Sequence, residues 1–231
     1  MFRLFLSFLF VFGSLYGSEA LEAFKNKEYD KAFKLYEKRA KHGDVAAQSA
    51  LSYLYANGLG VKKDTKKAVK WLQKAADGNY TNSQYDLGMK YLIGSDVEKD
   101  NKKALKYLGL AADDKHADAA YNLALMYYNG DGVDINVTKT AELLEMAAKQ
   151  GHQGAINNVG RIWMQLLKFD KAKKWLEINA KNGDTTAYYF LAELYCESEN
   201  YKEAKKWAKK AMDENNEAAK LLWDKYNLEK Y

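Results

Sequence analysis

The chain has 231 residues, and its 36 lysines and arginines against 31 aspartates and glutamates give a formal net charge of +5. A positive charge this small does not indicate nucleic-acid binding, so we expect no nucleic-acid partner. The chain contains no proline and a single cysteine, Cys196. Uninterrupted helices are therefore favoured, and no intrachain disulfide can form. We expect Cys196 to be a half-buried packing residue, with a reactive thiol as the alternative.

The first 20 residues have the pattern of a secretory signal peptide. One basic residue, Arg3, precedes an apolar run over residues 4–12, and small residues follow. The run is too short to span a bilayer comfortably, and an uncleaved N-terminal anchor is the alternative to cleavage. We therefore expect a periplasmic or secreted mature chain, with no later segment apolar enough to cross a membrane.

From residue 35 onward, apolar residues recur with a long period. Three columns of residues run in phase, at steps of 36 that shorten to 32 towards the C-terminus. They are Leu35, Trp71, Tyr107, Leu143, Trp175 and Trp207; Ala40, Ala76, Ala112, Ala148, Ala180 and Met212; and Leu51, Leu87, Leu123, Val159 and Leu191. Such a period is typical of a solenoid of stacked supersecondary units, none of which can bury its apolar face alone.

Residues 46–78 illustrate one unit. Apolar residues at helical spacing predict a first helix that ends at Asn57-Gly58, because glycine accepts the left-handed conformation of a C-cap. Asp64 is placed to N-cap a second helix over residues 65–77. Each unit is therefore predicted to be an αα-hairpin. Small residues mark the positions where its two helices must approach closely: Ser52, Gly88, Ala124, Gly160 and Ala192.

Residues 50–61 and 67–76 resemble the Sel1-like repeat, a longer-looped relative of the tetratricopeptide repeat. Residues 123–133 match it equally well, whereas Asp96 replaces the second loop glycine in the unit between. Outside residues 46–151 the hairpins look more like tetratricopeptide units. Three of them open a second helix without a glycine loop, at Tyr29, Phe169 and Tyr201.

The repeats predict an all-α fold, a right-handed α-solenoid of about six αα-hairpins with a C-terminal capping helix. The capping helix is expected over residues 217–226, with a buried stripe formed by Ala218, Leu221, Leu222 and Tyr226. The predicted segments are a signal peptide (1–20), a tetratricopeptide-like hairpin (21–44), three Sel1-like repeats (45–151), and two tetratricopeptide-like hairpins with the capping helix (152–231).

Few residues are arranged for catalysis. His42, His116 and His152 fall at turns between units without metal-ligand spacing, so we expect no metal site and no cofactor. The resemblance also extends to secreted, cysteine-rich Sel1-like proteins, some of which are labelled β-lactamases or penicillin binders. Serine enzymes of that class need Ser-x-x-Lys, and no serine here has a lysine three residues later. Those relatives join neighbouring hairpins by a disulfide, and the matching positions here are Ala76 with Gln84 and Ala112 with Ala120.

A tyrosine-bearing groove is the candidate binding site. Counting outward from the buried columns places polar and aromatic residues on the inner face of each first helix, beginning at Ser49. Tyrosine combines a wide contact area with a hydrogen-bonding tip and is enriched at interfaces, although some of these rings must simply pack. The candidate partner-binding residues are Tyr53, Tyr85, Met89, Tyr121, Asn122, Leu125, Asn157, Asn158, Arg161, Tyr189 and Glu193.

Lysines recur on the second helices of several units. This basic stripe could meet an acidic partner or anionic lipid headgroups, and the alternative is a solvated helix face. The stripe includes Lys66, Lys67, Lys70, Lys74, Lys102, Lys103, Lys106, Lys202, Lys205, Lys206, Lys209 and Lys210.

Two short strings resemble the acceptor of bacterial periplasmic N-glycosylation. Residues 77–81 and 134–138 both contain Asn-x-Thr with an aspartate two residues before the asparagine. The composition supplies about 0.13 such strings by chance. Asn79 and Asn136 both fall in predicted turns, where a glycan is accommodated outside the core. Unmodified turn residues are the alternative, because Asn and Asp favour turns anyway.

These features favour an exported, non-catalytic scaffold that binds a protein or peptide partner in its concave, tyrosine-lined groove. One alternative is a hydrolase or penicillin-binding protein of the cysteine-rich Sel1-like class. Another is an accessory protein that binds cell-wall glycan through the same face.

Overall fold

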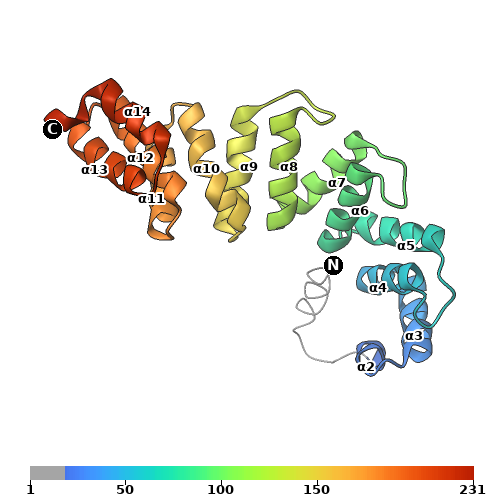
Figure 1. Cartoon of the computed structure of the whole chain (residues 1–231). Helices are drawn as coiled ribbons and strands as arrows, with labels where there is room; N and C mark the ends of the chain where they lie inside the picture. Colours follow the sequence, from blue (N-terminus) through green and yellow to red (C-terminus); the bar gives the residue numbers. More distant parts are fainter. Residues whose placement is uncertain (1–18) are drawn as a thin grey trace. The chain divides into compact units, whose positions relative to one another are not determined.

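The structure, a computed structural model, describes residues 19–231. In this part of the chain all regular structure is helical, with 13 α-helices, one short 3₁₀ helix and no strand (Figure 1). Contacts between neighbouring helices divide the chain into two compact units, with the boundary between Asp100 and Asn101. The all-α class predicted from the sequence is confirmed.

The first unit contains five described helices, each packed against the next along the chain. We call α2, α4 and α6 first helices, and α3 and α5 second helices, by their places in the hairpins. The bounds are α2 (Glu19–Lys25), α3 (Tyr29–Lys41), α4 (Val45–Asn57), α5 (Thr65–Asp77) and α6 (Thr81–Ile93).

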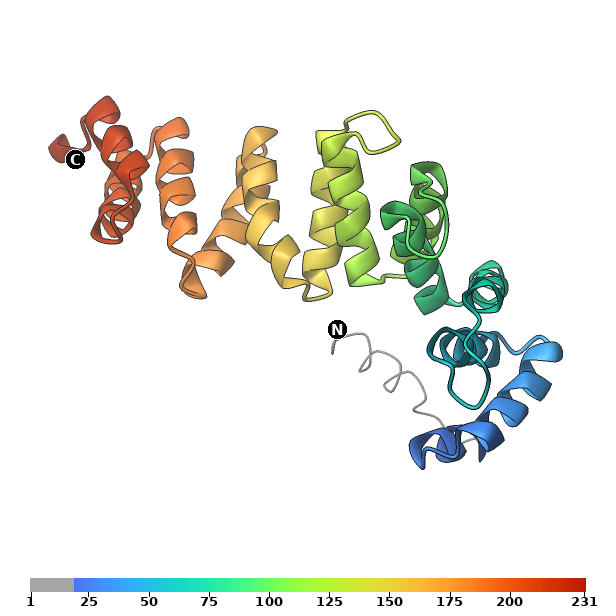
Figure 2. The same ribbon diagram turned by 45° about the vertical axis from the view of Figure 1, so that its right-hand side comes forward.

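The second unit contains eight α-helices and the 3₁₀ helix. In this unit α8, α10 and α12 are first helices, and α7, α9, α11 and α13 are second helices. Neighbouring helices from α7 to α14 pack side by side in chain order (Figure 2). The bounds are α7 (Asn101–Asp113), α8 (Ala117–Asn129), α9 (Val137–Lys149), α10 (Gln153–Gln165), α11 (Phe169–Lys181), α12 (Thr185–Glu197), α13 (Tyr201–Asp213), α14 (Glu217–Tyr226) and η1 (Leu228–Lys230).

The helix ends lie where the capping residues predict them. The Asp64 carboxylate accepts a hydrogen bond from the Lys67 backbone N–H at 2.9 Å and thereby caps α5. Asn136 caps α9 in the same way, since its Oδ1 accepts from the Lys139 N–H at 2.8 Å. Gly58 ends α4 with a φ of 68°, the left-handed conformation expected of a C-cap glycine.

The core follows the columns found in the sequence. Leu51, Leu87, Leu123, Val159 and Leu191 are all buried. The small residues allow close helix contact, as predicted: a Cβ on Gly160 of α10 would lie 2.9 Å from the Leu176 side chain of α11. A larger residue at position 160 would therefore push α10 away from α11.

The second glycine of each long loop allows the loop to dock on the preceding hairpin. Gly132 has a φ of 77°, and a Cβ there would lie 2.5 Å from the Asn101 side chain at the start of α7. Gly60 approaches the Tyr29 carbonyl at the start of α3 in the same way. Asp96 also has a positive φ of 63°, so the loop keeps its backbone conformation without a glycine.

One of the two hairpin junctions at which the resemblance implies a disulfide in cysteine-rich proteins, Ala76 with Gln84, is closed here by a hydrogen bond. Gln84 of α6 is buried, and its Nε2 donates a hydrogen bond to the Ala76 carbonyl oxygen at 3.3 Å. Gln48 and Ala40 repeat this bond one unit earlier, at 3.2 Å. A buried amide thus joins two neighbouring hairpins at the position matched to a disulfide.

One expectation about the C-terminal end needs revision. In the predicted stripe of α14, Leu222 is buried as expected, but Ala218 and Leu221 are exposed and Ala219 is buried instead. At the other end, most of the predicted signal peptide lies outside the described residues. Its last two residues, Glu19 and Ala20, belong to α2, and Ala20 is only 2% exposed within the core of the first unit.

Candidate functional site

The eleven predicted binding residues lie outside the buried core, on what we call the first-helix face. Leu125, Asn157 and Arg161 are exposed, and the other eight are half-buried. Ser49, which was expected to open the series on α4, is buried and does not belong to the face. The first unit contributes Tyr53, Tyr85 and Met89, and the second unit contributes the remaining eight.

In the first unit, Tyr53 takes part in an aromatic cluster. Its ring meets the edge of Phe24 from α2 at 6.0 Å between centroids, and Phe24 meets Tyr29 of α3 at 5.6 Å. Partial burial raises the pKa of the Tyr53 hydroxyl. Tyr53 therefore helps to hold α2, α3 and α4 together, which is the packing alternative left open by the sequence.

In the second unit, Tyr121 of α8 stacks on His152, the N-cap residue of α10. The ring centroids are 4.1 Å apart, with an angle of 22° between the planes. His152 Nδ1 accepts a hydrogen bond from the Ala155 backbone N–H at 3.1 Å, so the ring proton lies on Nε2. That nitrogen lies 3.5 Å from the Asp118 carboxylate. Tyr121, His152 and Asp118 thus join α8 to α10.

Two asparagines one repeat apart make the same hydrogen bond. Asn122 Nδ2 donates to the Asp118 carbonyl oxygen, and Asn158 Nδ2 donates to the Gly154 carbonyl oxygen, each at 2.7 Å. Each amide nitrogen is thereby bonded back to its own helix, and each amide carbonyl oxygen can still accept a hydrogen bond. Arg161 reaches the Asn158 oxygen at 3.4 Å and places a guanidinium beside it.

The face continues on α12 with a different pair. The Tyr189 hydroxyl donates a hydrogen bond to the Glu193 carboxylate at 3.2 Å. Burial, followed by the charge of Glu193, raises the pKa of Tyr189, so the hydroxyl keeps its proton at neutral pH. Leu125 and Tyr128 on α8 add apolar surface, each 38% exposed. The second unit therefore presents apolar, aromatic, amide and charged groups on one side of its first helices.

Three residues of this face were missed by sequence reasoning. His152 was assigned to a turn, while Asp118 and Tyr128 were not considered. The sequence contained a pattern that indicates capping by His152, because His116 and His152 lie one repeat apart immediately before α8 and α10. Imidazole is uncommon among strong N-cap side chains, and for that reason the pattern was not recognised as capping.

Several groups that could act as nucleophiles are poorly placed for catalysis. Ser49, Ser52 and Ser83 are buried, and the exposed Ser198 hydroxyl donates a hydrogen bond to the Leu194 carbonyl oxygen at 2.6 Å. Cys196 is also buried, more completely than predicted, and burial together with Glu197 raises the pKa of its thiol to about 11. A thiol of this kind stays protonated at neutral pH and is a weak nucleophile. Within residues 19–231, no group of three or more His, Cys, Asp or Glu side chains could hold a metal ion.

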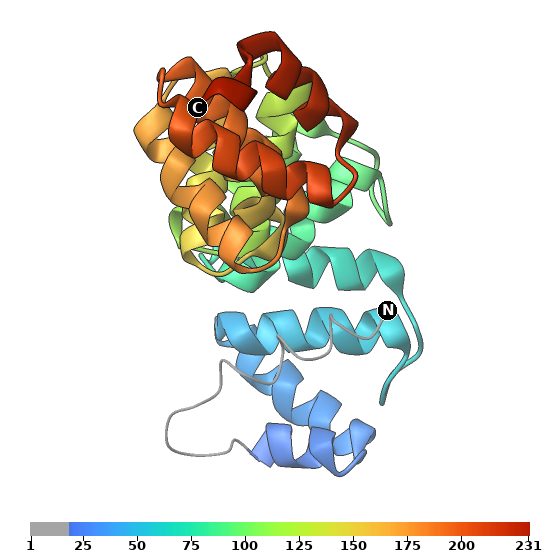
Figure 3. The same ribbon diagram turned by 60° about the vertical axis from the view of Figure 1, so that its left-hand side comes forward.

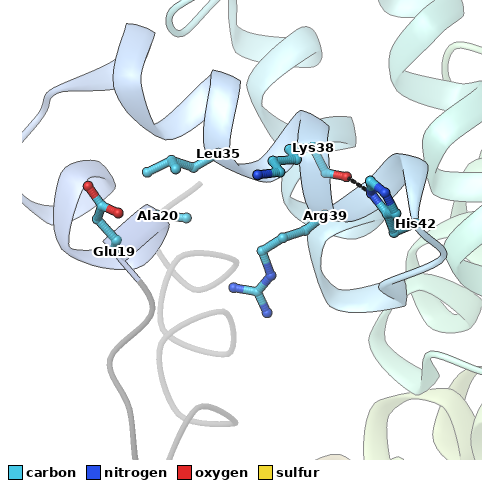
Figure 4. A pocket seen from close by; sticks show the side chains of 6 residues that line it. All are labelled: Glu19, Ala20, Leu35, Lys38, Arg39 and His42. Atoms are coloured by element: carbon cyan, nitrogen blue, oxygen red, sulfur yellow. Dashed lines mark hydrogen bonds between the residues drawn. The ribbon is translucent and has the colours of Figure 1, made fainter.

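A pocket of about 450 Å³ lies in the first unit between α2 and α3 (Figure 4). Two of its lining residues make contacts within the unit. Arg39 binds the Asp44 carboxylate through Nη2 at 2.6 Å, and His42 Nδ1 donates to the Lys38 carbonyl oxygen at 2.7 Å. Since Asp44 also caps α4, Arg39 and His42 stabilise the turn between α3 and α4. The pocket is lined by Glu19, Ala20, Leu35, Lys38, Arg39 and His42.

The lysine stripe lies against the aromatic column of its own helices. Lys74 Nζ sits 4.3 Å from the centroid of the Trp71 ring, and Lys210 Nζ sits 4.5 Å from that of Trp207. Cation–π contacts at exposed sites stabilise a helix by about 0.5–1 kcal/mol. These contacts favour the solvated-face alternative, in which the lysines cover large rings and keep their charges in water.

No helix within residues 19–231 is both long and apolar enough to cross a membrane.

Comparisons with known proteins bear out the resemblance noted in the sequence. A family profile described as Sel1 repeat matches residues 14–44, 45–80, 81–116, 117–152 and 185–216. The matches include the three repeats identified from the sequence and two of the hairpins that resembled tetratricopeptide units. A search of curated proteins finds no match.

Two solved structures are similar to this chain. A Sel1 repeat protein from Oxalobacter formigenes shares 26% sequence identity with a TM-score of 0.64, over 84% of this chain and 83% of that protein. The protective antigen c5321 of uropathogenic Escherichia coli also shares 26% identity, with a TM-score of 0.56, over 83% of this chain and 43% of that protein. This chain therefore spans less than half of the E. coli antigen.

Proposed function

Because the chain belongs to the Sel1 repeat family, whose helical scaffold fits a protein-interaction role, we propose that it is an exported, non-catalytic scaffold for a protein partner. The partner is an extended polypeptide segment that binds to the first-helix face. In the second unit this face spans α8, α10 and α12.

The arrangement of Asn122 and Asn158 carries the proposal. Their amide oxygens recur on neighbouring first helices and can each accept a hydrogen bond from a backbone N–H of the partner. The Tyr121 ring lies next to Asn122 and is held in place by its stack on His152. A fixed aromatic ring beside fixed acceptors loses little entropy on binding, which is the property of an interface hot spot.

The hydrolase alternative is weaker because the chain lacks a Ser-x-x-Lys motif and its single thiol, Cys196, is buried. Incubation of the purified mature protein with a chromogenic β-lactam tests this point. Metal-independent turnover, lost on mutation of a serine or of Cys196, would contradict the scaffold role. Binding of cell-wall glycan fragments in place of protein would show that the face recognises sugar instead.

Export would remove the segment before α2 without disturbing the core. Glu19 forms an ion pair with Lys31 at 3.0 Å, and the next residue, Ala20, is buried. Cleavage before Glu19 keeps both contacts, whereas cleavage after Ala20 removes them. We therefore expect the mature chain to begin at Ser18 or Glu19. The intact mass of the protein from the periplasm or the growth medium measures this start directly.

Photo-crosslinking in the native host tests the binding face. A photoreactive phenylalanine analogue at Leu125, which is 38% exposed on α8, should capture the partner. The same analogue at Leu167, which is 72% exposed in the turn between α10 and α11, provides the matched control. Equal yields of crosslinked partner at Leu125 and Leu167 would show that the partner does not bind specifically to the first-helix face.

Replacing Tyr121 by Ala should weaken binding of the captured partner by about 2 kcal/mol, or roughly thirtyfold in Kd. Tyr231→Ala, at the exposed C-terminal residue, should leave Kd unchanged. Calorimetry with the captured partner measures both values, and circular dichroism checks that helicity is kept. A Tyr121→Ala variant that loses its helicity would show that the ring belongs to the core, and unchanged binding would remove it from the interface.

A further inference from the structure

Two exposed turns carry asparagines that the scaffold role leaves unexplained. They contain the two Asn-x-Thr strings of the chain, and in both the residue two before the asparagine is aspartate. We propose that Asn136 is an acceptor for an N-linked oligosaccharide, and that Asn79 is a second, less fully occupied acceptor. The inference depends on export of the chain but not on the proposed binding face.

The loop of residues 130–136 makes Asn136 accessible. This loop connects α8 to α9 and projects beyond the ends of both helices (Figures 1 and 2). Asn136 is exposed and extended, with φ of −141° and ψ of 92°. Asp134, Ile135 and Thr138 are exposed as well, and Ile135 is 65% exposed despite its apolar side chain. Because Val137 and Thr138 belong to the first turn of α9, an enzyme could bind the whole string in an extended form by opening that turn alone, without opening the core.

The cap made by Asn136 leaves its reactive atom available. Its Oδ1 accepts the hydrogen bond from the Lys139 N–H at 2.8 Å. Among the described residues, no acceptor takes a hydrogen bond from its Nδ2, which is the atom that carries an N-linked glycan. A glycosylated asparagine keeps the carbonyl oxygen of its side-chain amide. The α9 cap can therefore persist after modification, and the glycan extends from the loop into solvent.

The reaction is a glycosyl transfer from a lipid-diphosphate-linked oligosaccharide, catalysed by a transferase of the host. The Asn136 Nδ2 attacks the anomeric carbon of the first sugar. The new N–C bond forms as the bond from that carbon to the diphosphate oxygen breaks. The lipid diphosphate leaves with the bonding electron pair, and Nδ2 gives up one proton to a base of the transferase. No oxidation or reduction takes place.

Asn79 offers the same chemistry in a less suitable conformation. It lies exposed in the turn between α5 and α6 with a φ of 62°, in the left-handed region, rather than in an extended backbone. Asp77, two residues earlier, is the last residue of α5, and its carboxylate accepts a hydrogen bond from Gln73 at 2.9 Å. Binding of this string in an extended form needs the end of α5 to open, so we expect lower occupancy at Asn79.

Mass spectrometry of the exported protein from its native host tests the proposal. The tryptic peptide that ends at Lys139 should carry a glycan on Asn136, at higher occupancy than the peptide containing Asn79. The modification should disappear in the Thr138→Ala variant and persist in Thr138→Ser, since serine keeps the hydroxyl. An Asn136 peptide found entirely unmodified would overturn the proposal, whether or not the N-terminal segment has been removed.

Two variants separate loss of the glycan from loss of the cap. Asn136→Asp keeps a side-chain oxygen for the Lys139 N–H, so α9 should stay capped while the acceptor nitrogen is absent. Asn79→Gly keeps the left-handed turn and also removes an acceptor. Each variant should lose the glycan at its own position and retain it at the other. If a variant carried the same added mass on a neighbouring residue, the modification would not be N-glycosylation of the asparagine.

Discussion

At the scale of single residues, histidines act as helix caps at two of the junctions between units. His116 Nδ1 accepts a hydrogen bond from the Ala119 N–H at 3.2 Å, as His152 does from Ala155 at 3.1 Å. An imidazole can accept through Nδ1 only when that nitrogen is unprotonated. Burial lowers the pKa of His116, although the Asp118 carboxylate opposes the shift. The folded state therefore favours the neutral cap.

This preference makes the cap sensitive to acid. Because the pKa of His116 is lower in the folded state than in the unfolded state, its contribution to the free energy of unfolding is complete above about pH 6.5. The contribution is lost as the pH falls through the lowered pKa of the folded state. Asparagine caps a helix at every pH, so His116→Asn should lose less stability than the wild type between about pH 7 and pH 5.

Urea unfolding at a series of pH values measures the difference. At about pH 8 the two proteins should agree to within roughly 1 kcal/mol, because both side chains then act as caps. If the free energy of unfolding fell equally for the wild type and His116→Asn below neutral pH, the acid sensitivity would come from groups other than His116.

At the scale of elements, the C-terminal cap is larger than the helix expected from the sequence. After α14, Asn227 takes a left-handed conformation with a φ of 50° and leads into η1. Leu228 of η1 is fully buried, and Lys205 of α13 donates a hydrogen bond to the Glu229 carbonyl oxygen at 2.9 Å. α14 packs against α12 and α13, and η1 packs against α13 (Figure 3). The last buried side chain of the second unit thus comes from the residues after the final α-helix.

Two leucines of this cap provide a matched test. Leu228→Ala should cost roughly 2–5 kcal/mol of unfolding free energy, because it empties a fully buried site at the end of the unit. Leu221→Ala removes the same atoms from a side chain that is 72% exposed and should cost less than about 0.5 kcal/mol. Chemical denaturation followed by circular dichroism measures both. Equal losses would contradict the register given for α14 and η1.

The junction between α5 and α6 can be tested by adding the disulfide that the cysteine-rich relatives carry. In the oxidised Ala76→Cys/Gln84→Cys variant, a closed loop of about nine residues should stabilise the fold by about 2–3 kcal/mol. Loss of the Gln84 hydrogen bond offsets about 1 kcal/mol of this gain. Reductant should lower the Tm of the variant and leave that of the wild type unchanged, because Cys196 has no cysteine partner. A variant that stays reduced in air would show that the two positions do not match those of the relatives.

At the scale of the whole molecule, each described helix packs mainly against its neighbours along the chain. The stability of such an array is the sum of local terms, and a defect in one hairpin is felt mainly by that hairpin and the next. The two compact units follow the same rule, since each buries its own leucine and alanine side chains.

Leu123→Ala tests this locality within the second unit. Leu123 is buried in α8, and its truncation should cost roughly 2–5 kcal/mol. Hydrogen exchange should become faster in α7, α8 and α9, and remain slow in α12 and α13. Leu125→Ala on the exposed side of the same helix should leave exchange unchanged throughout. A uniform increase over α7 to α13 in Leu123→Ala would show that the unit unfolds as one cooperative block.

The sequence alone determined the fold class, the repeat register and most helix ends. The periodic columns predicted burial from Leu51 to Leu191, and the sequence predicted the N-cap made by Asp64. These features depend on neighbours within a few turns of the chain, so the local pattern is sufficient to specify them.

The tertiary structure decided everything that depends on which residue of one hairpin meets which residue of the next. Ser49 is buried, Tyr121 stacks on His152, and Asn122 and Asn158 bond their amide nitrogens back to their own helices. In α14, Ala219 is buried in place of Ala218, and η1 adds Leu228 to the core. Helical periodicity identifies the apolar face of a helix. It does not decide which residues at the border of that face are covered by the neighbouring helix. That choice is made by packing between elements, where a rotation of a fraction of a turn exchanges a buried residue for an exposed one.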